Sequence, residues 1–271
     1  NKIKTIAANA CRTVLALTFI FSGYVKASDP LGTQYKIHDY LEALGLSAYA
    51  PDWLTLCSSI ALSAVEFSLG IFMLFAIRRR ATSAAMLLFM MAMTAITVWI
   101  AIADPVSDCG CFGDAVTLTN MQTLAKNIVL LACAATVYAW PLRMYRFISR
   151  PAQWIAINYT ILFSLASSIV SLYLLPPFDF RPYHIGADLL KGMEIPADAP
   201  QPQFTTTFVM EKNGERKEFT LDDYPDSTWT FVDSKTVQTS EGYVPPIHDF
   251  SIQLEDGTDA TDNILTHKGY T

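Results

Sequence analysis

Five apolar stretches in the first two thirds of the chain are each long enough to cross a membrane. A helix needs roughly 20 predominantly apolar residues to span the hydrocarbon core of a bilayer. Hydrophobic residues make up 52% of the 271 residues, although the last third is ordinary polar sequence. The sequence therefore predicts a mainly α-helical membrane protein. The predicted spans are Thr5–Val25, Leu54–Ile77, Ala81–Ala103, Met121–Trp140 and Ala152–Leu175.

Charges in the connecting segments predict the orientation of these spans. Lysine and arginine concentrate in cytoplasmic loops. Here the N-terminus and the second and fourth loops are basic, whereas the first and third loops are mostly acidic. We expect an inner-membrane protein with a cytoplasmic N-terminus and a periplasmic C-terminal segment. A cleaved signal peptide fits less well, because Arg12 lies within the first apolar run. The basic residues are Lys2, Lys4, Arg78, Arg79, Arg80, Arg143, Arg146 and Arg150.

Three parts are expected along the chain: a membrane domain (residues 1–150), a fifth span (151–180) and a small α+β periplasmic domain (181–271). The last part carries 7 basic and 16 acidic residues, which makes nucleic acid an unsuitable partner. Within the first part, the spacing of apolar residues over Thr33–Leu44 predicts an amphipathic surface helix.

The C-terminal part contains a β-hairpin pattern. Two strand-like runs, Phe204–Lys212 and Arg216–Leu221, flank the turn dipeptide Asn213-Gly214. A further strand is predicted over Thr228–Val232. Little apolar sequence follows, so we expect the chain to end inside a domain.

Two cysteines one residue apart, Cys109 and Cys111, lie in the polar loop between the third and fourth spans. In an oxidising compartment such a pair forms a disulfide. It can be a structural staple, but a bridge closing so short a loop adds little stability. It can instead be a redox couple, favoured as thiolate by a helix start near Thr119 and by Lys126. Two sulfurs and nearby aspartates provide too few ligands for a metal site.

Ionisable residues inside spans are functional candidates. Glu66 and Arg12 lie at similar predicted depths, so they are expected either to form a structural bridge or to serve a proton relay or a quinone head group. Asn127, with Ser22 and Tyr24, can hydrogen-bond a quinone or join helices. Three more cysteines lie within spans. Cys57, near the outer end of its span, can exchange with the loop, whereas Cys11 and Cys133 are expected to be packing residues.

These residues together resemble the DoxX/MauE-like membrane proteins over about residues 1–140. That resemblance implies a four-helix membrane bundle similar to vitamin K epoxide reductase-like disulfide-forming enzymes, and the fifth span and tail resemble longer members from Bacteroidota. MauE-type members are implied to support maturation of disulfide-rich methylamine dehydrogenase, and DoxX members quinone-coupled sulfur oxidation. The segments that carry the resemblance are Arg12, Ser22-Gly-Tyr-Val-Lys26, Asp29-Pro30, Glu66 with Gly70, Cys109-Gly-Cys-Phe-Gly113 and Lys126-Asn127.

The tail segment from Pro246 to Gly257 is similar to the opening of thioredoxin-like domains, yet the tail contains no cysteine. The leading hypothesis is therefore an inner-membrane thiol–disulfide oxidoreductase that acts on a separate periplasmic thiol protein. Its catalytic residues would be Cys109, Cys111 and Lys126, with Glu66, Arg12 and Asn127 around a quinone. The alternative is a non-enzymatic anchor or assembly subunit that docks a membrane-complex partner through its periplasmic domain. Solute transport around Glu66 is disfavoured because the spans show no repeat symmetry.

Overall fold

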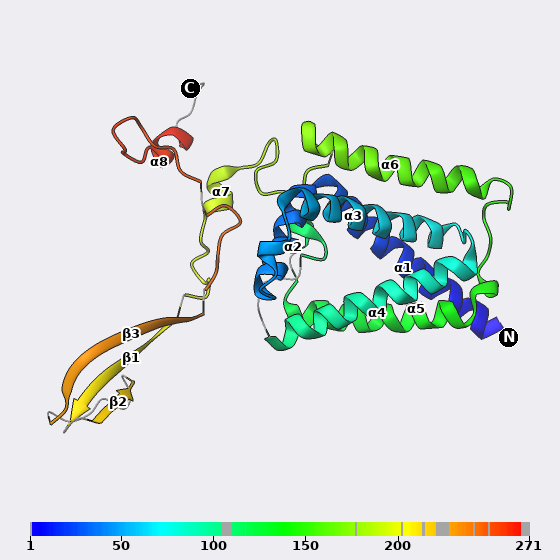
Figure 1. Cartoon of the computed structure of the whole chain (residues 1–271). Coiled ribbons are helices and arrows are strands. Elements are labelled where there is room, and N and C mark those ends of the chain that lie inside the picture. Colours follow the sequence, from blue (N-terminus) through cyan, green and yellow to red (C-terminus); the bar gives the residue numbers. More distant parts are fainter. Residues whose placement is uncertain are drawn as a thin grey trace. The chain divides into compact units, whose positions relative to one another are not determined.

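The chain separates into two compact units, Asn1–Arg181 and Pro182–Thr271 (Figure 1). Each unit has its own secondary structure: long helices in the first, and strands with short helices in the second. The computed structural model describes residues 2–103, 110–116, 118–176, 178–201, 203–212, 215–220, 228–240, 242–248 and 250–266.

Five helices in the described part of the first unit are long and apolar enough to cross a membrane. Each coincides with one predicted span, so those predictions are confirmed. The first helix extends beyond its predicted limits at both ends, which brings Lys26 into its last turn. The helices are α1 (Lys2–Ser28), α3 (Asp52–Leu74), α4 (Arg79–Ala103), α5 (Asn120–Ala139) and α6 (Gln153–Tyr173).

A shorter helix, α2 (Pro30–Ala43), follows α1 and packs against α3. Its N-terminus is capped by Asp29, whose carboxylate accepts a hydrogen bond from the Gly32 amide at 3.0 Å. This helix confirms the one predicted over Thr33–Leu44, and Ile37 on its apolar side is half-buried. The described residues of this unit also form three single-turn 3₁₀ helices: η1 (Ser47–Tyr49), η2 (Gly113–Ala115) and η3 (Pro141–Arg143).

The hydrophobic core lies between α1, α3, α4 and α5. Helix α1 packs chiefly against α3, and α4 packs against α5, as Figure 1 shows. Helix α6 packs onto α3 and α1, and its side chains Thr160, Ser164 and Ser168 are buried one turn apart. Small residues at that spacing let membrane helices approach closely. The specific likeness to the DoxX and vitamin K epoxide reductase bundles stays a prediction. Fully buried core residues include Leu15, Ala16, Met73, Met86, Ala134 and Val137.

At the end of this unit where α1 begins, side chains hold the segment that follows α5. The Arg79 guanidinium donates to the carbonyls of Leu142 and Met144 at 2.9 and 2.8 Å. The amide of Asn9 donates to the Arg143 carbonyl at 3.1 Å. These bonds satisfy backbone carbonyls that the end of a helix leaves without intrahelical partners.

The second unit contains a three-stranded antiparallel sheet in the order β2-β1-β3. The strands of this sheet are β1 (Gln203–Lys212), β2 (Glu215–Phe219) and β3 (Thr230–Ser240). The described part of the unit also contains two short helices, α7 (Leu189–Met193) and α8 (Thr261–Leu265). Pairing of β1 with β2 confirms the predicted hairpin, although its turn at 213–214 lies outside the described residues. The third strand, β3, continues to Ser240, well past the predicted end at Val232. Its second half is polar and pairs with β1 through the backbone, so no apolar pattern marked it in the sequence. The thioredoxin-like assignment stays a prediction.

Candidate functional site

The loop that carries Cys111 fits closely against α1 and α2. Gly110 and Gly113 have φ angles of 59° and 52°, which residues other than glycine rarely adopt. A Cβ on Gly110 would lie 3.0 Å from the Lys36 side chain, and one on Gly113 would lie 3.1 Å from Val25. The two glycines of the Cys-Gly-Cys-Phe-Gly motif therefore give the loop both its turns and its close contacts. Cys109 lies outside the described residues.

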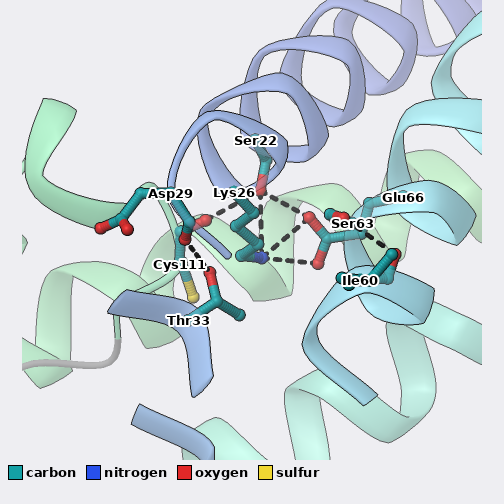
Figure 2. A network of polar contacts seen from close by, with 8 residues as sticks. All are labelled: Ser22, Lys26, Asp29, Thr33, Ile60, Ser63, Glu66 and Cys111. Atoms are coloured by element: carbon teal, nitrogen blue, oxygen red, sulfur yellow. Dashed lines mark hydrogen bonds and ion pairs between the residues drawn. The ribbon is translucent and has the colours of Figure 1, made fainter. Parts of the chain in front are cut away.

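Beside this loop, a buried ion pair joins α1 to α3 (Figure 2). The Lys26 ammonium donates to both carboxylate oxygens of Glu66, at 2.6 and 2.8 Å. Lys26 and Glu66 are only 7% and 4% exposed. Buried charges persist in apolar surroundings when they are paired and hydrogen-bonded. This pair thus lets two ionisable residues lie within the helix bundle.

Ser22 connects the ion pair to the cysteine loop. Its Oγ lies 2.7 Å from Glu66 Oε2 and 2.8 Å from the backbone carbonyl oxygen of Cys111. The Lys26 ammonium also donates to this Oγ, at 3.3 Å. Ser22 and Lys26 share one face of α1, because residues four apart lie on the same side of a helix. Figure 2 shows the resulting chain of contacts from Glu66 through Ser22 to Cys111.

The next loop residue, Phe112, is held from another direction. The Lys126 ammonium lies 4.1 Å from the centre of its ring, a cation–π contact. The ring also packs against Phe21 of α1, with centroids 5.6 Å apart. Helix α5 begins just beyond, with a capping box between Thr119 and Gln122. The structure therefore places Lys126 at the cysteine loop, while its predicted effect on a thiolate stays a prediction.

A small cavity of about 40 Å³ lies among these residues. A buried water needs about 10–15 Å³ measured in this way, so the cavity holds a few waters at most. Sites for small molecules usually enclose about 300–1,000 Å³. The cavity is smaller than this, and quinone binding stays a prediction. The lining residues are Thr18, Phe19, Ser22, Lys26, Glu66, Phe89, Met90, Met93, Cys111, Phe112, Lys126, Asn127 and Leu130.

Asn127, predicted either to contact a quinone or to join helices, donates its side-chain amide to Thr97 Oγ1 at 3.2 Å. This buried bond joins α5 to α4, the helix-joining alternative considered for this residue. Tyr24, which was also a candidate for hydrogen-bonding a quinone, packs against Phe178 with ring centroids 6.3 Å apart.

The predicted bridge between Arg12 and Glu66 is wrong. The Arg12 guanidinium donates to the Tyr145 carbonyl at 2.6 Å and lies over the ring of Phe147. Arg12 is 14 residues before Lys26, or about 21 Å along α1 at 1.5 Å per residue. The predicted first span ends at Val25, so Lys26 was not recognised as the partner of Glu66. Its spacing of four residues from Ser22 was the available signal.

The remaining cysteines have separate environments. Cys11 and Cys133 are half-buried and pack against the hydrophobic core, as predicted for packing residues. Cys57 is exposed on α3, and its predicted exchange with the loop stays a prediction. Within the described ranges, no group of three or more His, Cys, Asp or Glu residues could hold a metal ion.

Two family models match the chain. One, described as methylamine utilisation protein MauE, matches residues 4–140. The other, a domain of unknown function (DUF8463), matches residues 204–241. No curated protein and no solved structure matches. The first match spans the cysteine loop, the ion pair and Lys126, whereas the second falls on the sheet of the other unit.

Proposed function

The chain belongs to the MauE family of membrane proteins, and from this premise we propose an accessory role in methylamine utilisation, in which it exchanges disulfides with a partner protein. The exchanging group is the Cys109/Cys111 pair. The single observation that carries the proposal is the attachment of Cys111 to the buried Lys26–Glu66 pair through Ser22. A simple staple needs no buried charges beside it, and ionisable residues within membrane helices are costly and tend to mark functional sites.

The proposed orientation puts the cysteine loop outside the cytoplasm. Arginines at the opposite end of the helices support it through the positive-inside rule. Disulfides form and persist in the periplasm but rarely in the cytosol. The site of action is thus the periplasmic surface of the inner membrane, where the partner is a thiol protein.

The chemistry is exchange through a mixed disulfide. In the oxidising direction, a partner thiolate attacks one sulfur of the Cys109–Cys111 disulfide and releases the other as a thiolate. The partner's second thiol, after losing its proton, then attacks the mixed disulfide. The partner leaves with a disulfide, and the loop keeps two thiols after taking up two protons. A second disulfide-bearing protein restores the loop by the same steps, so no quinone is required.

Thiol trapping in intact cells tests this function. Alkylation with a mass tag, before and after an external reductant, reports whether the loop pair cycles. In Cys111→Ala, Cys109 can still attack a disulfide-bearing protein, but no second loop thiol resolves the mixed disulfide, so adducts with that protein should accumulate on Cys109. The matched control is Cys133→Ala, which removes a core thiol and should trap no partner.

The competing function is a non-enzymatic anchor or assembly subunit. A loop pair that stays oxidised, with no adducts in Cys111→Ala, would replace the exchange proposal with this one. The orientation has a test of its own in spheroplasts. An impermeant maleimide should label the reduced loop without lysis, and labelling only after lysis would refute a periplasmic loop.

A further inference from the structure

The Ser22 hydroxyl faces two acceptors but has one hydrogen. Glu66 Oε2 and the Cys111 carbonyl oxygen lie at nearly equal distances from it, 2.7 and 2.8 Å. A hydroxyl donates one hydrogen bond at a time. Glu66 and Cys111 therefore compete for the same hydrogen, and the outcome decides whether Ser22 holds the Cys111 backbone.

Lys26 governs this competition. Its ammonium donates to both Glu66 oxygens, which offsets the carboxylate's charge and makes it a weaker acceptor for Ser22. The ammonium also donates to Ser22 Oγ, which leaves the serine hydrogen pointing elsewhere. With Lys26 in place, the hydrogen is available to Cys111. Without Lys26, the buried carboxylate becomes the stronger acceptor, because charge-assisted hydrogen bonds are about twice as strong as neutral ones.

We propose that Ser22 is a positioning residue for Cys111 and that the Lys26–Glu66 pair controls its hold on the loop. When Ser22 donates to Cys111, the loop is fixed against α1. When Ser22 turns to Glu66, the loop is released and Cys111 becomes more reactive. The inference deepens the proposed function, on which it rests for the identity of Cys111 as an exchanging residue.

Other contacts of the loop do not involve Ser22. Phe112 packs against Phe21 and lies beneath Lys126, and Gly110 lies against Lys36. Release by Ser22 is therefore a local change near Cys111. It does not require the helices to separate.

The test measures alkylation of Cys111 by N-ethylmaleimide in the purified full chain. A Cys109→Ser background leaves Cys111 as the single loop cysteine, and peptide mass spectrometry separates it from the cysteines in the helices. Four changes are compared in this background: Ser22→Ala, Ser22→Thr, Lys26→Met, and Lys26→Met combined with Glu66→Leu. The matched control is Ser63→Ala, because Ser63 is a buried serine on α3 whose hydroxyl donates locally to Ile60.

The proposal predicts a specific order of rates. Ser22→Ala and Lys26→Met each speed alkylation about tenfold, the scale expected from losing one hydrogen bond to a partly buried acceptor. The double change removes the competing carboxylate, so the rate returns to that of the unchanged background. Ser22→Thr, which keeps the hydroxyl, and the Ser63 control leave the rate unchanged.

Two outcomes would overturn the inference: a Ser22→Ala rate equal to the background, or a double change that stays as fast as Ser22→Ala. The comparison of the double change with Ser22→Ala remains valid even if the single Lys26→Met variant does not fold. Failure of the proposed function gives a different result. Restoring Cys109 and adding a dithiol probe would then show no exchange, although the alkylation order stands.

Discussion

Gly70 of α3 lies against the backbone of Ile20 in α1, where a Cβ on the glycine would come within 2.7 Å of the Ile20 nitrogen. One turn away, Gly23 of α1 lies equally close to Phe67 of α3. On α3 both contacts lie within the turn that follows Glu66. They set the separation of the two helices at the level where Lys26 reaches Glu66.

Gly70→Ala should therefore destabilise the membrane unit. The added methyl forces α1 and α3 apart, and overpacking of this kind costs about 1–3 kcal/mol. Alanine favours a helix over glycine by only about 1 kcal/mol, so the clash dominates. Thermal unfolding in detergent measures the loss. Ala61→Val, on an exposed part of the same helix, is the control, and equal stability of the two variants would contradict the packing argument.

Lys126→Met should slow alkylation of Cys111 in the Cys109→Ser background. The ammonium lies 4.1 Å from the ring of Phe112, so a positive charge is held beside the cysteine. Nearby cations favour the reactive thiolate. We expect a reduction of roughly twofold to fivefold, which corresponds to about 0.5–1 kcal/mol of lost electrostatic stabilisation of the thiolate by a solvent-accessible cation. Lys126→Arg should keep the rate.

A control for this change exists at the other end of the membrane unit. The Lys4 ammonium lies 5.3 Å from the ring of Trp140, a similar contact far from the cysteine loop. Lys4→Met should leave the alkylation rate unchanged. If both lysine changes slow the reaction alike, the charge beside Phe112 has no special effect.

Arg12→Leu should loosen the segment after α5 without altering thiol exchange. The change removes the donor to the Tyr145 carbonyl and the contact with Phe147. Loss of such a charged hydrogen bond is worth about 1.5–3 kcal/mol. Hydrogen exchange of residues 141–147 should become faster by at least tenfold. A loss of disulfide exchange instead would restore Arg12 as a site residue.

The turn before α8 should weaken in acid. Hydrogen bonds from the hydroxyl and amide of Thr261 hold the pKa of Asp259 below its usual value. A carboxyl whose pKa is lower in the folded state stabilises that state above its unfolded pKa, about 3.9, and loses this effect as pH falls through the folded pKa. NMR titration of labelled aspartates measures the shift. Asp259→Asn should remove the pH dependence of this turn, and an unshifted titration would contradict the assignment.

Much of the membrane unit could be predicted because lipid imposes a simple rule on sequence. Runs of apolar residues gave all five helices, and the spacing around Ile37 gave α2. The partner of Glu66 could not be found in this way. Helix α3 begins beside α2, beyond the end of α1. The position of Glu66 along α3 therefore does not show which residue of α1 lies opposite it. Opposite Gly70 lies Ile20, whereas a depth estimate had put Arg12 near Glu66.

The second unit was harder to predict for a different reason. Alternating apolar residues mark a strand only where one side is buried. The first half of β3, around Phe231, has apolar residues, whereas the following residues from Asp233 to Ser240 are almost all polar. Their place in the sheet comes from backbone pairing with β1, which leaves no pattern in the side chains.

Arg79 belongs to the basic cluster on which the proposed orientation rests, and its guanidinium also donates to the carbonyls of Leu142 and Met144. A substitution that removes this charge in order to invert the protein in the membrane would thus also remove both hydrogen bonds. An inverted chain obtained in this way would carry two lesions, so topology is better probed by adding lysines at the opposite surface than by removing this arginine.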